Sequence, residues 1–485
     1  MTAGMKEEIA WIAAAAALAA GEATGLALPS LAAFWSLAAL AAVLAILFTF
    51  GGGAVRTITV CAFLLGVSIA MHRTEARIDA LDRLLELNRG KPVEGCFTIP
   101  NELSCRPDEK GGGTKVSFPG TLNGIRVRVM FTLAEGETPP APGETWRCAG
   151  WLTRGGELFG SARRSLWVRG SGTFARRCEP SGEGGALSIA IRIRESLSRR
   201  LGIGLENSPE TAGLLRAILL GDKSALSKTS RETFSAAGTA HVFAISGLHV
   251  VIVAKLLSLL LTLMFVPRRW TGLALIPLTW CYVCITGSGP SAVRAAAMAS
   301  IYFAAPMFWR KPNALMAWLI TFVFAHAIHP EALLDAGSLL SYTVMLSLIL
   351  WARTGVAAGR KLVSGIVASS VAWTAGAPIV ARCFGTCSPG GLAANIVMIP
   401  AAGVAVTAGA VGALTSFVSE TAASYLNACA GMFVEIMKGV SLLVASIPLS
   451  AARPADWSVP FCIAWYAALS ACLALLRLTN RQVIR

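Results

Sequence analysis

Long apolar runs dominate this chain, and one long polar stretch interrupts them. Three apolar runs come first, over residues 9–28, 31–50 and 54–71. Nine more follow the polar stretch, over residues 239–266, 271–288, 290–308, 313–328, 333–352, 361–381, 390–417, 421–447 and 457–477. Most reach the length of about 17–25 residues that a helix needs to cross a bilayer. The pattern predicts a polytopic α-helical membrane protein with about 12 spans.

The polar stretch, residues 72–186, has the pattern of a small β domain. GIRVRVMF (Gly124 to Phe131) alternates as a strand does, and PPAPG and RGGELFG supply breaks between strands. We therefore expect N-terminal transmembrane helices over 1–71, an inserted all-β soluble domain over 72–186, and a second membrane domain over 187–485. The first segments of that last domain, Leu187–Leu201 and Pro209–Leu220, predict amphipathic helices that are basic on one side. They either lie flat on the membrane surface or pack on the β domain as linkers.

Composition and charge support the membrane class and predict the topology of the chain. A content of 55% apolar and only 14% charged residues excludes a soluble protein of this size, and the net charge is +15. If the N-terminus is cytoplasmic, three spans place the β domain outside. The basic residues of the turns then fall inside, apart from Arg294 and Arg382: they are Arg56, Arg268, Arg269, Arg310, Lys311, Arg353, Arg360, Lys361, Arg477, Arg481 and Arg485. This follows the positive-inside rule and predicts that both termini are cytoplasmic.

The β domain carries arginine and aromatic residues together. From Gly120 to Cys178 there are nine Arg, no Lys and four Glu, interleaved with tryptophan and phenylalanine. Guanidinium groups contact phosphates and rings stack on bases, so this mixture favours binding of single-stranded nucleic acid. The candidate residues are Arg126, Arg128, Arg147, Trp151, Arg163, Arg164, Trp167, Arg176 and Arg177. The alternative is that the tryptophans fill the core and the arginines form a solvated face.

Four cysteines lie in the same domain: Cys96, Cys105, Cys148 and Cys178. In an oxidising compartment they are candidates for one or two disulfides, whose pairing the sequence leaves open.

GTAHVFAISGLHV (Gly238 to Val250) is unlike ordinary membrane sequence. It places two histidines and a Ser-Gly pair at the start of an apolar run, and buried imidazoles need hydrogen-bond partners that hydrocarbon cannot supply. Such a segment is tolerated where it faces protein or a water-filled cavity. The polar residues of the membrane domain that we expect to line a path are His241, Ser246, Gly247, His249, Asp222, Arg294, Asp335 and Asn395. Glu435 and Lys438, three residues apart, are instead expected to neutralise each other.

AHVFAISGLHV, preceded by LLRAILLGDKSALS (Leu214 to Ser227), closely resembles the core motif of the ComEC family, the inner-membrane channels for DNA uptake in competent bacteria. ITGSGPSAVRAAAMA (Ile285 to Ala299), HPEALLDAGSLLSYTVML (His329 to Leu346) and GGLAANIVMIP (Gly390 to Pro400) follow in the family's order. The resemblance implies a multi-pass protein of the bacterial plasma membrane that imports single-stranded DNA during natural transformation. It also implies that the insert is a barrel of OB type that receives the strand.

The implied partners are single-stranded DNA, the lipid bilayer, separate DNA-receptor, nuclease and cytoplasmic motor proteins, and a second copy of the chain. Many ComEC relatives carry a C-terminal metallo-β-lactamase-like domain thought to be the nuclease, whereas this sequence ends at Arg485 without its metal motif. The five histidines form no HExxH pattern, and Gly221-Asp222-Lys223-Ser224 lacks the Gly-Lys pair of a P-loop. We expect no enzyme activity, metal or cofactor.

Three alternatives stay open. The first is a small-solute transporter with a periplasmic cap. The second is a membrane enzyme in which His241 and His249 bind a metal, which requires the break at Ser246-Gly247 to bring them together. The third is a transport-inactive structural relative.

Overall fold

The structure is a computed structural model. It describes residues 83–472 except 85, 89–92, 100–103, 108–113, 123–124, 134–143, 155–165, 170–174, 178–185, 223–225, 244, 329–334, 356–360, 386, 448–460, 463 and 470. The three N-terminal spans, and most of the span predicted at 457–477, lie outside these residues. The chain divides into two compact units, Met1–Ile193 and Arg194–Arg485. The boundary expected at 186–187 lies at the start of helix α4, and the division itself falls within that helix.

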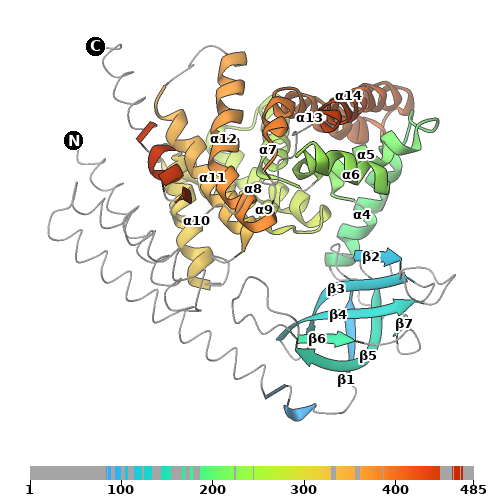
Figure 1. The fold of residues 1–485 in the computed structure, drawn as a ribbon. Helices are drawn as coiled ribbons and strands as arrows, with labels where there is room; N and C mark the ends of the chain where they lie inside the picture. Colours follow the sequence, from blue (N-terminus) through green and yellow to red (C-terminus); the bar gives the residue numbers. More distant parts are fainter. Residues whose placement is uncertain are drawn as a thin grey trace. The chain divides into compact units, whose positions relative to one another are not determined.

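Seven strands form a mixed sheet in the first unit (Figure 1). They are β1 (Val93–Thr98), β2 (Ser104–Pro107), β3 (Thr114–Leu122), β4 (Ile125–Leu133), β5 (Thr145–Arg154), β6 (Leu166–Arg169) and β7 (Ala175–Arg177). The strand order is β1-β5-β6-β4-β3-β2, with β7 beside β5. The pair β4–β6 is parallel and the others are antiparallel. Strands β3 and β4 form a hairpin in which Leu122 pairs with Ile125.

The core of this unit comes from alternate strand residues. Phe118, Val129 and Phe131 are buried, and the Phe131 ring stacks on Trp146 with centroids 5.9 Å apart. Strands β1 and β3, which are far apart in the strand order, approach each other: a Cβ added to Gly120 would lie 2.6 Å from the Phe97 ring. The sheet is therefore strongly curved around one hydrophobic core. Trp146 belongs to that core, as the alternative sequence interpretation proposed for the tryptophans.

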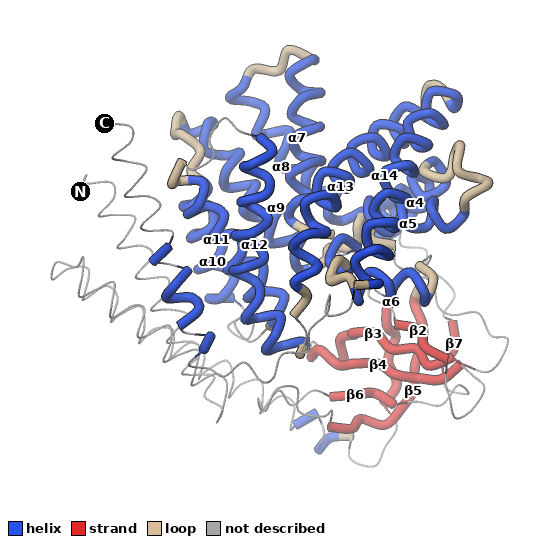
Figure 2. The backbone as a smooth tube through the Cα atoms, turned by 45° about the horizontal axis from the view of Figure 1, so that its top comes forward, coloured by secondary structure: helices blue, strands red, loops and turns tan. Residues whose placement is uncertain are grey.

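The described part of the second unit is helical (Figure 1 and Figure 2). Its elements are α4 (Ala186–Arg200), α5 (Pro209–Leu220), α6 (Lys228–Ala236), the 3-10 turn η2 (Ala240–Phe243), α7 (Gly247–Leu263), α8 (Arg268–Ile285), α9 (Pro290–Ala304), η3 (Ala305–Phe308), α10 (Ala314–Ile328), α11 (Ala336–Ala352), α12 (Lys361–Phe384), α13 (Pro389–Thr415) and α14 (Glu420–Ser446). Helices α13 and α14 are the longest of these and lie side by side.

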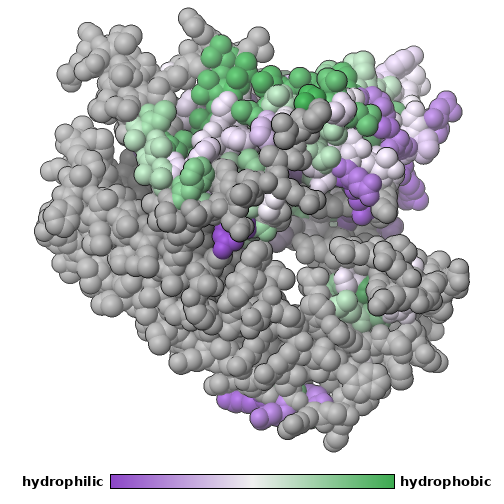
Figure 3. All heavy atoms as spheres, viewed as in Figure 1, coloured by the Kyte–Doolittle hydropathy of each residue, from purple (hydrophilic) through white to green (hydrophobic). Residues whose placement is uncertain are grey.

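Within the described residues, four helical segments are long and apolar enough to cross a membrane: Pro290–Phe308, Val363–Cys383, Pro389–Thr415 and Glu420–Ser446. Shorter apolar helices cover Gly247–Leu263, Arg269–Ile285, Ala314–His326 and Ala336–Ala352. Exposed apolar side chains such as Leu259, Ile436 and Leu443 cover the outside of this unit, and green patches mark its apolar surface in Figure 3. Lipid is the solvent that suits such a surface, so the fold is that of a helical membrane protein. The span count stays a prediction.

The predicted span 239–266 contains two separate elements, η2 and α7, divided by the loop before Gly247, where the Ser-Gly pair predicts a break. Another prediction about these helices is wrong. The predicted surface helix Pro209–Leu220 is α5, and nine of its 12 residues are buried. Leu215 and Ile218 belong to the core that α5 shares with α13 and α14. The amphipathic pattern of α5 predicts one exposed face, but packing against α13 and α14 covers both of its faces.

Candidate functional site

The stretches that resemble the ComEC family lie where helices begin. AHVFAISGLHV leads into α7, and GSGPSAVRA leads into α9. The hydroxyl of Ser291 donates a hydrogen bond to the carbonyl oxygen of Ile245, 2.6 Å away, which ties the start of α9 to the loop before α7. A Cβ added to Gly247 would lie 3.5 Å from the Cβ of Ala295, an ordinary contact. Gly247 therefore leaves room for one methyl group beside α9.

The starts of α11 and α13 join the same assembly. Arg294, on α9, donates from Nη2 to the carbonyl oxygen of Gly337 on α11 at 2.9 Å. Asp335 is the N-cap of α11, and its carboxylate accepts from the Ser338 backbone N–H at 2.9 Å. At the start of α13, the Ser388 hydroxyl donates to the carbonyl oxygen of Ala237, 3.3 Å away. We call this assembly the helix-start cluster: residues 237–250, 290–295, 335–338 and 388–395.

The end of α5 reaches the helix-start cluster as well. Gly221 caps α5 in a left-handed conformation, and a Cβ there would lie 3.1 Å from the Ile245 side chain. The phenol of Tyr282, on α8, donates to the carbonyl oxygen of Leu219 at 3.1 Å. Asp222, the next residue after the cap, is half-buried and interacts electrostatically with Arg194. It lies at the edge of the cluster.

Ser246 and His249 form a reciprocal cap at the start of α7. The Ser246 backbone N–H donates to Nδ1 of His249 at 3.1 Å, and the Ser246 hydroxyl lies 2.9 Å from the same nitrogen. Because Nδ1 accepts from a backbone N–H, the proton of the neutral imidazole must be on Nε2. His249 is only 3% exposed, and Nε2 has no hydrogen-bond partner among the described residues. The imidazole thus presents a buried hydrogen-bond donor.

Three of the predicted path residues share this unusual feature. The buried atoms Nε2 of His249, Nε of Arg294 and Oδ1 of Asn395 lack a hydrogen-bond partner within the part of the chain that the structure describes. An unsatisfied buried polar group costs about 1–3 kcal/mol, so water or a polar ligand is expected to reach each of them. The same feature occurs outside the cluster, at Arg200, Arg216, Trp351, Ser369 and Asn427.

His241 lies on η2, where its Nδ1 is 3.3 Å from the carbonyl oxygen of Gly238. The break before α7 places His241 on η2 and His249 in the first turn of α7. Metal binding by Nε2 of His249 would require the imidazole proton to move to Nδ1, which would break the hydrogen bond from the Ser246 N–H. Within the described residues there is also no group of three His, Cys, Asp or Glu that could hold a metal. The pair is better suited to hydrogen bonding than to metal chemistry.

In the β unit, strand register gathers most of the predicted DNA-binding positions. Arg128 is opposite Trp167, and Trp151 is opposite Arg169. Arg147 is opposite Arg176, and Arg126 is opposite Thr121. Along β4 and β5 these positions alternate with the buried residues Val127, Val129, Trp146 and Cys148, so they occupy the other face of the sheet. We call this the arginine–tryptophan face: positions 126, 128, 147, 151, 167, 169 and 176.

Of the three other predicted DNA-binding residues, one occupies the opposite side of the sheet and two are assigned to neither side. Arg177 pairs with Trp146, a core residue, and so occupies the opposite side of the sheet from its neighbour Arg176. Arg163 and Arg164 lie outside the described residues. Arg169, which is opposite Trp151, was missed as a candidate, although strand alternation could have placed it on the same face as Trp167.

The strand register also limits which of the predicted disulfides can form. Cys96 on β1 is exposed and Cys148 on β5 is buried, which places them on opposite faces of neighbouring strands. A disulfide between these two is therefore disfavoured. Cys178 and the side chain of Cys105 lie outside the description, so any pairing with them stays a prediction.

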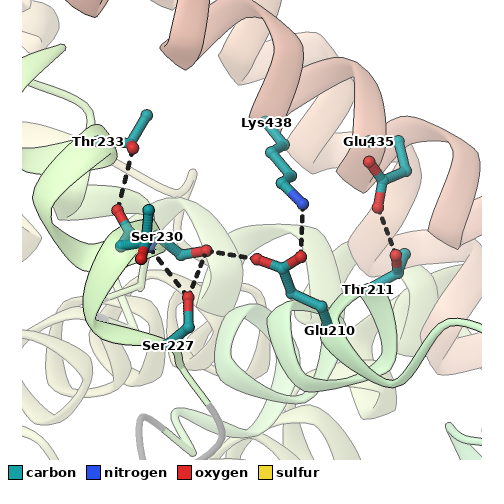
Figure 4. A network of polar contacts seen from close by, with 8 residues as sticks. Glu210, Thr211, Ser227, Ser230, Thr233, Glu435 and Lys438 are labelled. Atoms are coloured by element: carbon teal, nitrogen blue, oxygen red, sulfur yellow. Dashed lines mark hydrogen bonds and ion pairs between the residues drawn. The ribbon is translucent and has the colours of Figure 1, made fainter.

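Sequence analysis also missed a polar network that joins α5, α6 and α14 (Figure 4). Lys438 forms an ion pair with Glu210 at 2.6 Å, and Glu210 also accepts from the Ser230 hydroxyl at 2.7 Å. Glu435 accepts from the Thr211 hydroxyl. The sequence predicts that Glu435 and Lys438 neutralise each other. They do interact electrostatically, but one turn of α14 also carries both toward α5, which supplies the direct partners Thr211 and Glu210.

These features describe a helical membrane protein whose polar motif residues meet where four helices begin. The chain belongs to the Competence protein family, whose family model matches residues 218–479. That range contains all four helix starts of the cluster and none of the β strands.

One curated relative supports the assignment. The chain is 27% identical over 192 residues to ComE operon protein 3 of Bacillus subtilis (strain 168). The alignment covers 40% of this chain and a quarter of the length of that relative (25%). No solved structure gives a significant match.

Proposed function

We propose that this protein is a channel of the bacterial plasma membrane that imports single-stranded DNA during natural transformation. The observation that carries the proposal is the set of unpartnered buried polar atoms on His249, Arg294 and Asn395, three residues of the family stretches. A path for a hydrated polyanion needs polar groups inside the bundle, and these three residues lie on the family stretches beside four helix N-termini. Family membership and the similarity to a ComE operon protein favour DNA as the cargo.

The charge of the helix-start cluster suits a phosphate backbone. Four helices begin in the cluster, and each helix N-terminus carries a partial positive charge that favours anions. Arg294 adds a full positive charge, and the neutral imidazole of His249 adds a hydrogen-bond donor. A strand that passes the cluster would exchange part of its hydration for these groups. The contacts are to the backbone, so transport would not depend on DNA sequence.

We propose that the β unit is an OB-like barrel that receives the strand. Its parallel pair β4–β6, its antiparallel pairs and the approach of β1 to β3 fit the Greek-key order of such a barrel. On the arginine–tryptophan face, guanidinium groups would meet phosphates and indole rings would stack on bases. With both termini in the cytoplasm, this face would lie on the side from which DNA arrives. We propose that a separate nuclease and a cytoplasmic motor act with the channel.

A deletion strain tests this function directly. Loss of the protein is expected to abolish transformation by DNA added to competent cells, while electroporated plasmid still transforms normally. DNA bound outside the cell should accumulate in a nuclease-sensitive form. Normal transformation in the deletion strain would contradict the proposal, and a defect confined to uptake of a small solute would favour the transporter alternative.

A further inference from the structure

Two turns of the helical unit place a bulky aromatic residue where the backbone favours glycine. Phe265 and Trp309 each have a φ of 57°, in the left-handed region that side chains disfavour. At six other left-handed positions among the described residues the chain has glycine, and the remaining exception, Ser288, is small. The two aromatics therefore carry a conformational cost that glycine would avoid.

Both turns are helix caps of the same kind. The Val266 N–H donates to the carbonyl oxygen of Leu261 after α7, and the Arg310 N–H donates to that of Ala305 after η3, each at 3.0 Å. This six-residue closure is the Schellman motif, in which the left-handed residue is usually glycine. The caps themselves therefore do not explain why the sequence has Phe265 and Trp309.

The packing of the protein does not explain them either. Phe265 is 93% exposed and Trp309 is 86% exposed, with Met264, Trp270 and Phe308 exposed nearby. The rings gain nothing from a protein core. At the ends of membrane helices, however, aromatic rings gain energy by entering the headgroup region of the bilayer.

Basic side chains accompany the rings. Arg269, Arg310 and Lys311 are exposed, and the Arg269 guanidinium lies 5.4 Å from the centroid of the Trp270 ring. The sequence has no Asp or Glu between residues 233 and 330, so no acidic residue of this long segment neutralises them. Exposed positive charge beside exposed rings is complementary to an anionic lipid surface.

The two turns form one surface. At the start of α8, a Cβ added to Gly272 would clash with the carbonyl oxygen of Phe303 and lie 3.4 Å from the sulfur of Met307. The start of α8 therefore lies against the end of α9 and η3. We call residues 264–270 and 305–311 the turn patch. It lies at the ends of α7 and α9 opposite to the helix-start cluster, so it is distinct from the proposed DNA path.

We propose that the turn patch binds the anionic phosphate headgroups of membrane lipids in one leaflet. Phe265 and Trp309 insert among the headgroups, and Arg269, Arg310 and Lys311 contact lipid phosphates. The planar guanidinium groups suit bidentate contact with phosphate oxygens. The headgroup layer thereby fixes the depth of α7, α8 and α9 in the membrane.

The test uses the full-length protein in nanodiscs of phosphatidylcholine, with or without phosphatidylglycerol, and measures the thermal midpoint. Phosphatidylglycerol is expected to raise the midpoint of the wild type. The triple variant R269Q/R310Q/K311Q should lose most of that increase. A variant with matched charge loss in the β unit, R126Q/R128Q/R147Q, should keep it. No increase in the wild type, or a full increase in the R269Q/R310Q/K311Q variant, would overturn the proposal.

A second variant keeps the test independent of folding defects. In detergent, F265G/W309G should be at least as stable as the wild type, because glycine relieves the left-handed strain. In nanodiscs it should gain less from phosphatidylglycerol. If it is instead destabilised in detergent and gains as much as the wild type in nanodiscs, the rings serve the fold and the proposal fails. Inorganic phosphate in detergent should give no increase, and an increase equal to that from lipid would contradict a headgroup surface.

Discussion

The backbone N–H of Ser246 donates a hydrogen bond to Nδ1 of His249, 3.1 Å away, where α7 begins. This contact does two things. It closes the start of the helix as the Ser-x-x-Glu/Gln capping box does in other proteins, and it fixes the imidazole proton on Nε2. One residue therefore holds the helix start and presents a donor to the helix-start cluster.

Replacing His249 by Gln and by Glu separates these roles. Both replacements can accept from the Ser246 N–H, so α7 should form in each. Gln also supplies an N–H donor and should keep part of DNA uptake. Glu supplies only acceptors and a negative charge, and should abolish it. Transformation frequency, with membrane levels of each variant as the control, measures the difference. Equal uptake by both variants would argue against a donor role for Nε2, and loss in both together with sensitivity to chelators would favour a metal.

Gly238 should tolerate no side chain. Its φ is +72°, and an added Cβ would lie 2.5 Å from the Cβ and hydroxyl oxygen of Ser388. Left-handed strain and overpacking together predict that G238A lowers the free energy of unfolding by about 2–4 kcal/mol. Gly439→Ala, where no atom lies within 4 Å of the added Cβ, is the matched control and should be neutral or slightly stabilising. Unfolding in detergent, followed by circular dichroism, distinguishes the two. Equal stability of both variants would show that the contact between Gly238 and Ser388 is not close.

The ion pair between Glu210 and Lys438 should make stability depend on pH. The hydrogen bond from Lys438, followed by that from Ser230, lowers the pKa of Glu210 below its ordinary value. A lowered carboxyl pKa stabilises the folded state above the unfolded pKa, and this contribution is lost as the pH falls through the folded pKa. The pair is partly exposed, so K438M should cost about 0.2–1 kcal/mol near pH 7. That difference from the wild type should shrink as the pH falls below about 4.

Lysine removal elsewhere serves as the control for this experiment. Lys255→Met, on α7, should leave the slope of stability against pH unchanged. A K438M difference that stays constant from neutral to acidic pH would show that Glu210 does not stabilise the fold through its charge.

If the arginine–tryptophan face binds DNA, substitutions of neighbouring arginines should have unequal effects on DNA binding. Arg147 and Arg176 are opposite each other on that face, whereas Arg177 is opposite the core residue Trp146. R147E/R176E in the full-length protein should weaken binding of single-stranded DNA and reduce the salt slope by about 1.4, at 0.7 for each phosphate contact. R177E should change the salt slope little. Fluorescence anisotropy with a labelled oligonucleotide measures the affinity and its salt slope for each variant. An effect of R177E as large as that of the double variant would contradict the assignment of Arg177 to the opposite side of the sheet.

Local pattern was sufficient to predict the helical membrane class, the break at Ser246-Gly247 and a β domain, because hydrophobic period and turn residues are properties of neighbouring residues. Local pattern failed where contacts between segments far apart in the sequence determine the structure. Helix α5 has an amphipathic pattern, yet α13 and α14 bury both of its faces. Lys438 pairs with Glu210, 228 residues away, rather than with the nearby Glu435. The polar residues of the family stretches could be named individually, but their meeting at four helix starts depends on tertiary contacts such as that between Arg294 and Gly337.

Photo-crosslinking of incoming DNA tests the proposed path most directly. A photoreactive residue is placed at Ser246 or Asn395 in the helix-start cluster, or at Leu259 or Tyr425, which are exposed on the outside of α7 and α14. Competent cells receive labelled DNA and are irradiated during uptake. Crosslinks to DNA are expected from positions 246 and 395 and not from 259 and 425, at matched protein levels. Crosslinks from 259 or 425 that equal or exceed those from 246 and 395 would contradict a path through the helix-start cluster.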